Sequence, residues 1–202
     1  MKSWNIGNND IIRFGEGITS DNLDVTRINN NLIIAILGTT DKITVSEYFM
    51  DTSSKIEEFA FADGTTLTSQ QIESMVVLRG TDGNDIINGS MESDTINGKK
   101  GDDQLYGQDG NDTYIFNLGD GQDTIYDSSW NTNNKDIICF GEGIVATDVT
   151  ITQDQSNLYF TLNSSEDKIM IASYFDAPEY QIEQVTFTDG TLWNSTMFNQ
   201  IL

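Results

Sequence analysis

The sequence contains no histidine, one cysteine and one proline among its 202 residues. Without histidine, neither a Ser-His-Asp nor a Cys-His catalytic arrangement can form, and nothing activates the thiol of Cys139. A single cysteine permits no internal disulfide, and the scarcity of nitrogen and sulfur ligands argues against a zinc or copper site. We therefore do not expect an enzyme, and we expect Cys139 to be an ordinary strand residue.

Basic residues are also scarce, because 10 Lys and Arg stand against 32 Asp and Glu, for a net charge of −22. Phosphate binding needs basic patches, so we expect no nucleic-acid partner, and anionic membrane surfaces are disfavoured for the same reason. No run of about 18 apolar residues occurs, so we expect no transmembrane segment. The first ten residues, MKSWNIGNND, contain no apolar core, and we do not expect them to be a cleaved secretory signal.

Glycine and aspartate recur at a fixed period in the middle of the chain. Residues 80–115 are four consecutive nine-residue units, GTDGNDIIN, GSMESDTIN, GKKGDDQLY and GQDGNDTYI, and a fifth, LGDGQDTIY, follows after an offset of two residues. Glycine opens the four units (Gly80, Gly89, Gly98, Gly107), and the fifth has Gly121 at its fourth place, where Gly83, Gly101 and Gly110 stand in the first, third and fourth units. Aspartate takes the sixth place (Asp85, Asp94, Asp103, Asp112, and Asp123 in the fifth unit). An apolar or aromatic residue takes the eighth place (Ile87, Ile96, Leu105, Tyr114, Ile125).

This spacing has a physical interpretation. Glycine and small polar residues favour a turn, and the three residues after it form a very short strand whose one apolar side chain points inward. If two units make one coil, units two apart stack and bring loop carbonyls and a carboxylate together. A hard cation that takes about six to eight oxygen ligands fits this set of donors.

The units resemble the RTX, or haemolysin-type, calcium-binding repeat G-G-x-G-x-D-x-U-x, which implies a right-handed parallel β-roll. The alternative is a disordered linker rich in glycine and aspartate, which composition alone would not bring into register. By resemblance, the calcium (Ca2+) ligands are carboxylates or turn carbonyls of Gly80, Asp82, Gly83, Asp85, Gly89, Asp94, Gly98, Lys100, Gly101, Asp103, Gly107, Asp109, Gly110, Asp112, Gly119, Gly121 and Asp123. For a single aspartate, the alternative role is a turn residue that accepts backbone N–H groups.

Three sites between stacked turns are expected from this arrangement. Asp85 would face turn 98–101, Asp94 would face turn 107–110, and Asp103 would face turn 118–121. The second unit has Ser90 and Glu92 where glycines are expected, and we expect Glu92 to need a turn conformation that glycine adopts more easily, unless its carboxylate replaces a ligand. Lys99 and Lys100 lie in the third turn and repel a divalent ion. We therefore expect one to three occupied sites, with Asp103 and the Gly119–Gly121 turn among the strongest.

The segments on either side of the repeats are duplicates of each other, displaced by 126 residues without gaps. FGEGI at 14–18 recurs at 140–144, DKI at 41–43 recurs at 167–169, and DGT at 63–65 recurs at 189–191. They resemble the haemolysin-type calcium-binding-related segment. In the first copy we expect a hairpin that turns at 29–31, further short strands, and a short helix over SQQIESMVV.

The fold class predicted is therefore all-β: a β-roll flanked by two homologous β-rich capping modules with short terminal helices. The predicted domains are residues 1–79, 80–126 and 127–202. We expect the flanks to continue the stacking of the roll and to cover its open ends, because uncapped strand edges are exposed to pairing.

Two smaller features have alternative interpretations. DSSWNTNNK at 127–135 is expected to be a surface loop, in which Trp130 is either a packed anchor, the favoured interpretation, or an exposed contact. Asp63 and Asp189 in the matched DGT turns are either extra ligands or, as we favour, turn residues.

The resemblance implies a calcium-binding module of a secreted, extracellular bacterial RTX protein, such as a toxin, a haemolysin or another exoprotein, that folds on calcium binding after type I secretion. One alternative is an adhesin module of a cell-surface protein with a host-surface or glycan ligand, for which Trp4, Trp130 and Trp193 are candidate contacts. The other is a passive spacer for a catalytic domain encoded elsewhere.

Overall fold

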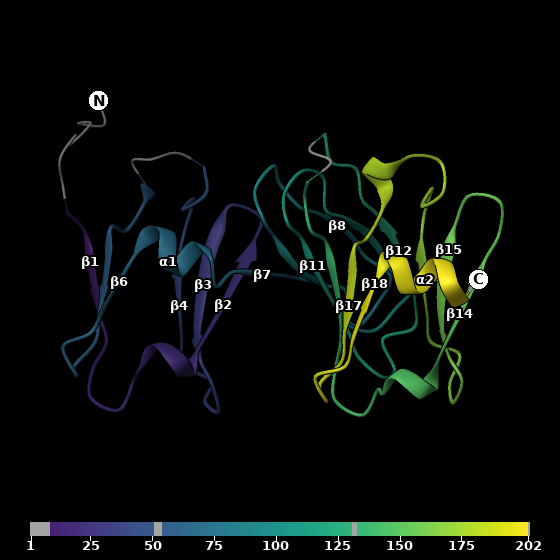
Figure 1. The fold of residues 1–202 in the computed structure, drawn as a ribbon. Helices are drawn as coiled ribbons and strands as arrows, with labels where there is room; N and C mark the ends of the chain where they lie inside the picture. The colour runs from purple at the N-terminus through teal and green to yellow at the C-terminus, as the bar shows by residue number, and fades with distance from the viewer. Residues whose placement is uncertain (1–8, 51–53, 131–132, 202) are drawn as a thin grey trace. The chain divides into compact units, whose positions relative to one another are not determined.

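The computed structural model describes residues 9–50, 54–130 and 133–201, and of residues 199–201 it describes the backbone only. The chain divides into two compact units, Met1–Val77 and Leu78–Leu202, each of which is described by itself (Figure 1). Strand β7 (Val77–Arg79) lies at the boundary. Trp4 lies outside the described residues.

The strands of the first unit form two groups of three. One is built from β1 (Ile11–Arg13), β5 (Glu58–Ala60) and β6 (Thr66–Thr68), and the other contains β2 (Leu23–Ile28), β3 (Asn31–Ile36) and β4 (Lys42–Val45). The β2–β3 hairpin turns at Asn29, whose φ of 54° is one that asparagine tolerates. Helix α1 (Ser69–Glu73) begins after Thr68, whose hydroxyl accepts the N–H of Gln71. The predicted hairpin is therefore confirmed, and the predicted helix is present but ends earlier, at Glu73.

An apolar core holds the first unit together. Leu32, Ile34, Tyr48, Phe59 and Ile72 are fully buried, and each aliphatic or aromatic side chain of this size contributes roughly 1.5–3 kcal/mol on burial. This unit therefore has a core of its own.

The second unit consists of two stacks of parallel strands. The first stack contains β8 (Ile86–Asn88), β10 (Gln104–Tyr106), β12 (Gln122–Tyr126) and β16 (Lys168–Ile171). The second contains β9 (Thr95–Asn97), β11 (Thr113–Phe116), β13 (Ile137–Phe140) and β17 (Gln184–Thr186). Units two apart pair, as predicted: Leu105 of β10 lies opposite Ile87 of β8. The eighth-place side chains Ile96, Leu105, Tyr114 and Ile125 are buried between the stacks, so the parallel β-roll is confirmed.

The second flank continues both stacks. β16 pairs with β12 of the roll, and β13 pairs with β11. Antiparallel strands then complete each sheet: β15 (Leu158–Leu162) and β14 (Val149–Gln153) on one side, and β18 (Leu192–Asn194) on the other. Helix α2 (Ser195–Ile201), yellow in Figure 1, places Phe198 edge-on to Phe160, with ring centroids 5.5 Å apart. The roll and the second flank therefore share one body, and the predicted continuation of the stacking is confirmed for this flank.

The duplication seen in the sequence is also a duplication of structure. Pairs of matching elements begin 126 residues apart: β4 and β16 at Lys42 and Lys168, and α1 and α2 at Ser69 and Ser195. Their environments differ, because β16 is covered by pairing with β12 and Ile169 is buried, whereas Ile43 on β4 is exposed. None of the described helices is long and apolar enough to cross a membrane.

Two predictions on single residues are wrong. Trp130, which we expected to be packed, is 95% exposed; only its backbone is fixed, because its N–H donates to Oδ1 of Asp109. Glu92, which we expected to need a glycine-like conformation, does not have a positive φ. At the fourth place of a unit, glycine is needed where a Cβ would contact the preceding coil, as at Gly101 and Gly110. Glu92 belongs to the first coil of the roll, so the roll has no earlier coil for its side chain to contact.

Candidate metal centre

The sixth-place aspartates form a ladder that runs along the roll. From the third unit on, one carboxylate oxygen of each aspartate accepts the backbone N–H of the aspartate one coil earlier, and Asp136 of the second flank continues the series. The N–H groups of Asp85, Asp94, Asp103 and Asp112 donate to Oδ1 of Asp103, Asp112, Asp123 and Asp136, at 2.7, 2.8, 3.1 and 2.8 Å. One oxygen of each acceptor is thus committed to the fold, and the chemistry of the site depends on the other oxygen, Oδ2.

A second ladder runs in the opposite direction and uses the fifth place. Side-chain oxygens of Asn84, Ser93, Asp102 and Asn111 accept the N–H groups of Asp102, Asn111, Gln122 and Lys135, at 3.0, 3.1, 3.0 and 2.8 Å. Sequence reasoning missed these residues. The signal was present, because the fifth place of the first four units holds a short side chain with an oxygen acceptor.

In the first two units, Oδ2 of the sixth-place aspartate accepts hydrogen bonds from its own turn. Oδ2 of Asp85 accepts the N–H and the hydroxyl of Thr81, at 2.6 and 2.8 Å. Oδ2 of Asp94 accepts the same two groups of Ser90, at 2.6 and 2.9 Å. These two carboxylates therefore act as caps of their own turns.

In the later units this cap is missing, because the second-place residue is neither Thr nor Ser. Lys99 and Gln108 replace them, with φ of 66° and 75°. Oδ2 of Asp103, Asp112 and Asp123 is buried and accepts no hydrogen bond in the part of the chain that the structure describes. A buried carboxylate oxygen without a partner is costly unless a proton or a cation neutralises it.

Burial has the expected effect on these carboxyl groups. Loss of hydration, with a smaller contribution from nearby carboxylates, raises the pKa of Asp112 to about 7 and that of Asp123 to about 8, from 3.8. The pKa of Asp103 is raised for the same reasons, although the N–H of Asp85 opposes the shift. The roll therefore concentrates negative charge where water has limited access.

Asp85 and Asp94 are predicted to face the turns 98–101 and 107–110, and the surroundings of Gly80 and Gly89 show where these carboxylates lie. A Cβ on Gly80 would lie 2.4 Å from the carbonyl oxygen of Gly98 and 2.8 Å from Oδ2 of Asp85. A Cβ on Gly89 would lie 2.5 Å from the carbonyl oxygen of Gly107 and 3.0 Å from Oδ2 of Asp94. Each of these carboxylates thus lies near the turn predicted for it, but as a cap.

The Gly119–Gly121 turn, predicted to be among the stronger sites, binds a carboxylate of the second flank. The N–H groups of Gly119 and Gly121 donate to the carboxylate of Asp167, at 2.7 and 3.1 Å, and the carbonyl oxygen of Gly121 accepts the N–H of Lys168 at 2.9 Å. Asp120 is buried and accepts the N–H of Asn117. Much of the hydrogen-bonding capacity of this turn is therefore used to join the roll to the second flank.

The residues of the predicted ligand set differ in burial. Gly98, Asp103, Gly107, Asp112 and Asp123 are buried; Gly80, Asp85, Gly89, Asp94, Gly101, Asp109, Gly110 and Gly121 are half-buried; Asp82, Gly83, Lys100 and Gly119 are exposed. Lys100 and Asp82 form a loose ion pair with 3.9 Å between Nζ and Oδ2, which at such exposure contributes little. As ligands, these residues stay a prediction.

The DGT turns behave as turns. Oδ1 of Asp63 accepts the N–H of Thr65, and Oδ1 of Asp189 accepts the N–H of Thr191, both at 2.8 Å. Both carboxylates are exposed, and these hydrogen bonds lower the pKa of each. The favoured interpretation of Asp63 and Asp189 is confirmed.

Sequence reasoning also did not single out Asp127 and Asp136. The structure brings both to Asp112, with one carboxylate oxygen of each within 4.8 Å of the others. The interval from Asp112 to Asp136 is 24 residues instead of 18, so the nine-residue period does not reveal Asp136.

Comparison with known families agrees with both resemblances. The RTX calcium-binding nonapeptide repeat (4 copies) matches residues 77–91 and 89–125. The haemolysin-type calcium binding protein related domain matches residues 31–71 and 157–197. Repeats of this type bind Ca2+, and the buried, unpartnered carboxylate oxygens of Asp103, Asp112 and Asp123 fit a hard cation that prefers oxygen ligands.

Similar proteins extend well beyond this chain. The iron-regulated protein FrpA of Neisseria meningitidis serogroup C is 35% identical over 81 residues, which are 39% of this chain and 7% of FrpA. The extracellular lipase LipA from Serratia marcescens aligns with 81% of this chain and 31% of its own, at 15% identity and a TM-score of 0.36. This chain therefore spans a small part of the length of either protein.

Proposed function

Because the chain carries RTX calcium-binding nonapeptide repeats between two haemolysin-type calcium-binding-related domains, we propose that it is a non-catalytic module whose roll folds when calcium binds. The observation that carries this proposal is the set of buried, unpartnered Oδ2 atoms of Asp103, Asp112 and Asp123. At neutral pH, these carboxylates oppose folding unless a cation neutralises them.

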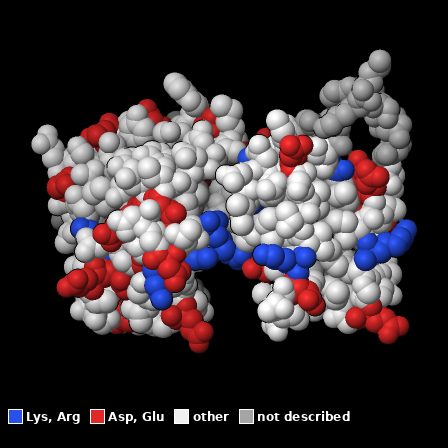
Figure 2. Space-filling model, turned by 180° about the vertical axis from the view of Figure 1, so that it is seen from behind, with Lys and Arg blue, Asp and Glu red and all other residues white. Residues whose placement is uncertain are grey.

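The rest of the roll supplies little stability to offset that opposition. Strands β8, β9 and β10 have three residues each, and strands of this length are marginal in isolation. Acidic groups are spread over the surface of each unit (Figure 2), and the net charge of −22 repels itself in a compact state. Calcium that binds only the folded roll then stabilises it by mass action.

This coupling suits a protein that is exported before it folds. In calcium-poor cytosol the roll stays unfolded, and outside the cell, where calcium is plentiful, it folds. We propose export by a type I secretion apparatus and an extracellular site of action, within a parent protein of the toxin, haemolysin or exoprotein kind. The match to FrpA, described as an iron-regulated protein, supports membership in a much longer parent.

Circular dichroism of the whole chain, with and without calcium, tests this proposal. We expect calcium to increase the β-sheet signal and to raise Tm by well over 10 °C, while magnesium at the same concentration has a much smaller effect. A calcium-free chain that is already fully folded, with an unchanged Tm on adding calcium, would remove the proposal.

A second candidate is an adhesin role, which the exposure of Trp130 favours. Its indole is 95% exposed, and its backbone N–H is held by Asp109 in a turn of the roll. An exposed indole can stack on a sugar ring. Glycan-array binding in calcium that disappears in Trp130→Ala supports this role, and an array without signal in calcium removes it. With no ligand, the remaining role is a spacer within the parent protein.

A further inference from the structure

Three aspartates meet at the junction between the roll and the second flank. Asp112 precedes β11, Asp127 follows β12 directly, and Asp136 precedes β13 directly. One carboxylate oxygen of each lies within 4.8 Å of the others, and the three residues are 0%, 3% and 0% exposed. Two stacked coils and the loop between them thus converge on one buried point.

The hydrogen bonds around this cluster hold the carboxylates in place but leave two oxygens without a donor. Oδ1 of Asp112 accepts the N–H of Asp94, and Oδ2 of Asp127 accepts the hydroxyl of Tyr114 at 2.7 Å. Oδ1 and Oδ2 of Asp136 accept the N–H of Asp112 and the side-chain amide of Asn134. Oδ2 of Asp112 and Oδ1 of Asp127 are buried and accept nothing from the described residues. The donors therefore orient the cluster and leave free oxygens inside it.

The backbone leaves room for this convergence only because residue 107 is glycine. A Cβ at Gly107 would lie 2.1 Å from the Tyr114 hydroxyl, 2.4 Å from Oδ2 of Asp112 and 3.0 Å from Oδ2 of Asp127. Any other side chain would occupy the space in which these oxygens gather.

Three like charges at such separations repel strongly in a buried setting. A cation with a double or triple positive charge converts this repulsion into attraction, and hard ions select sites made only of oxygen. Each turn of the roll offers one sixth-place carboxylate, whereas the junction offers three carboxylates to one ion. Affinity for calcium increases with the number of charged ligands.

We propose that Asp112, Asp127 and Asp136 form a separate calcium site that joins the roll to the second flank and binds more tightly than the turn sites. This site uses two residues, Asp127 and Asp136, that lie outside the nine-residue pattern. Filling it would fix both ends of the loop 127–135 and hold β12, β11 and β13 together. It does not depend on whether the roll folds only with calcium.

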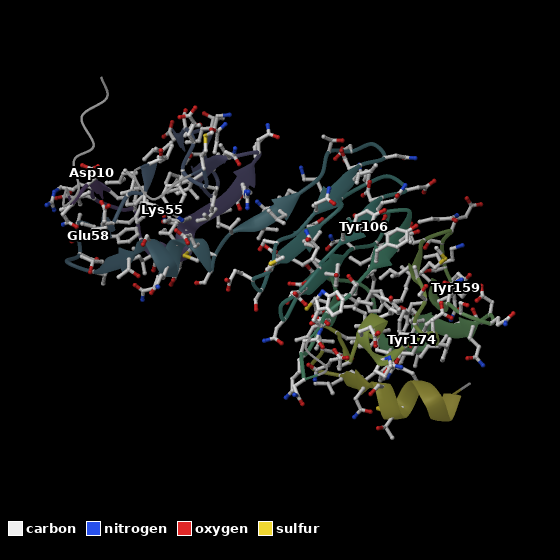
Figure 3. The ribbon with its side chains drawn as sticks, turned by 90° about the horizontal axis from the view of Figure 1, so that it is seen from above. Asp10, Lys55, Glu58, Tyr106, Tyr159 and Tyr174 are labelled. Atoms are coloured by element: carbon white, nitrogen blue, oxygen red, sulfur yellow. The ribbon has the colours of Figure 1, made fainter. Side chains whose placement is uncertain are left out.

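The matched control comes from the duplication. Asp10 is the counterpart of Asp136, and the N–H of each donates to a glutamate 47 residues later, Glu57 and Glu183, at 2.7 and 2.8 Å. Asp10 (labelled in Figure 3) is exposed, whereas Asp136 is buried. Asp10→Asn should therefore leave ion binding unchanged, while Asp136→Asn removes a ligand.

The test is to count bound calcium by native mass spectrometry and to measure affinities by calorimetry for the whole chain, for Asp127→Asn, for Asp136→Asn and for Asp10→Asn. We expect the first two variants to lose one ion, the tightest, and to keep the others, and Asp10→Asn to match the parent chain. Full ion number and unchanged affinities in both junction variants overturn the proposal. A parent chain that binds no calcium at all would remove the proposed function as well, so the two failures are distinguishable.

Asp127 lies outside the strands, so its substitution should disturb folding less. If Asp136→Asn fails to fold in calcium, the ion count of Asp127→Asn tests the proposal. If neither variant folds, anomalous diffraction from the parent chain soaked in terbium decides it. A terbium peak bound by the three carboxylates supports the proposal, and terbium bound elsewhere in the roll but not at the junction overturns it.

Discussion

Gly101 lies directly against Gly83, one coil away: a Cβ on Gly101 would lie 2.7 Å from the carbonyl carbon of Gly83. Gly101 also has a φ of 130°, which side-chain-bearing residues rarely adopt. Gly83 has the same place in its unit, but a Cβ there would meet only the hydroxyl oxygen of Thr81, at 3.9 Å. One position of the repeat therefore requires glycine in one coil and not in another.

We expect Gly101→Ala to destabilise the second unit by about 2–4 kcal/mol, because it adds both backbone strain and overlap between coils. Gly83→Ala should change stability by no more than about 0.5 kcal/mol. Chemical denaturation of both variants in saturating calcium measures the difference. Equal losses would mean that the coils do not stack as closely as the structure has them.

The two kinds of sixth-place aspartate should respond differently to substitution. Asp85→Asn replaces an acceptor of two Thr81 hydrogen bonds, and we expect a loss of about 1–3 kcal/mol with the calcium response retained. Asp103→Asn removes the charge of a carboxylate whose Oδ2 is unpartnered, and we expect a weaker calcium response with little loss of stability in calcium-free buffer. Thermal melts with and without calcium separate the outcomes; an identical pattern in both variants would contradict the distinction.

Removal of calcium should act on one unit more than on the other. The first unit has its own core, and there Glu73 accepts hydrogen bonds from Lys55 (labelled in Figure 3) at 2.6 Å and from the hydroxyl of Tyr48 at 3.0 Å. In calorimetry we expect one transition that EGTA leaves in place and one that it shifts down or abolishes. At a free calcium concentration of about one hundred times Kd, each site adds roughly 2.7 kcal/mol. A single transition that moves as a whole would contradict this expectation.

The calcium-free second unit should lose stability as the pH rises. Burial raises the pKa of Asp112 and Asp127 to about 7 and that of Asp123 and Asp136 to about 8, from 3.8. Since these groups bind protons more tightly in the folded state, their stabilising contribution is complete below about pH 4 and is lost as the pH rises through about 7–8. We expect Tm in calcium-free buffer to fall between about pH 4 and about pH 8. The increase in Tm that calcium produces should become larger over the same range.

Asn variants provide the control for this pH dependence. Replacing Asp112 and Asp123 together by Asn should flatten the calcium-free profile, because Asn does not titrate. The exposed turn residues Asp63 and Asp189, whose pKa values are lowered, should lose their stabilising effect only in acid. A calcium-free Tm that rises between about pH 5 and pH 8 would contradict the prediction.

Aromatic contacts on the roll illustrate what repeat spacing does and does not predict. Tyr106, labelled in Figure 3, stacks on Tyr126 with ring centroids 4.6 Å apart, because β10 and β12 pair in register. Trp130, just beyond β12, has no strand partner to set its position. The general preference of large aromatic side chains for burial predicted that it would be packed, but it is exposed.

The coil could be predicted from the spacing of residues along the chain. A nine-residue period with glycine, aspartate and an apolar residue in fixed places leaves few folds other than stacked turns and short strands, and the displacement of 126 residues identified the second flank as a copy of the first. The nine-residue period and the displacement of 126 residues are both visible along one chain and require no knowledge of contacts between distant segments.

Which carboxylate oxygens are left without a partner could not be predicted in this way, because it depends on how the coils pack. Thr81 and Ser90 cap their aspartates, whereas Lys99 and Gln108 adopt a positive φ and do not, so identical aspartates in the repeat have different environments. The junction of Asp112, Asp127 and Asp136 arises because β13 follows β11 in its stack after an interval that breaks the period. Burial and hydrogen bonding between coils are properties of segments far apart in the chain, and no spacing rule within one unit contains them.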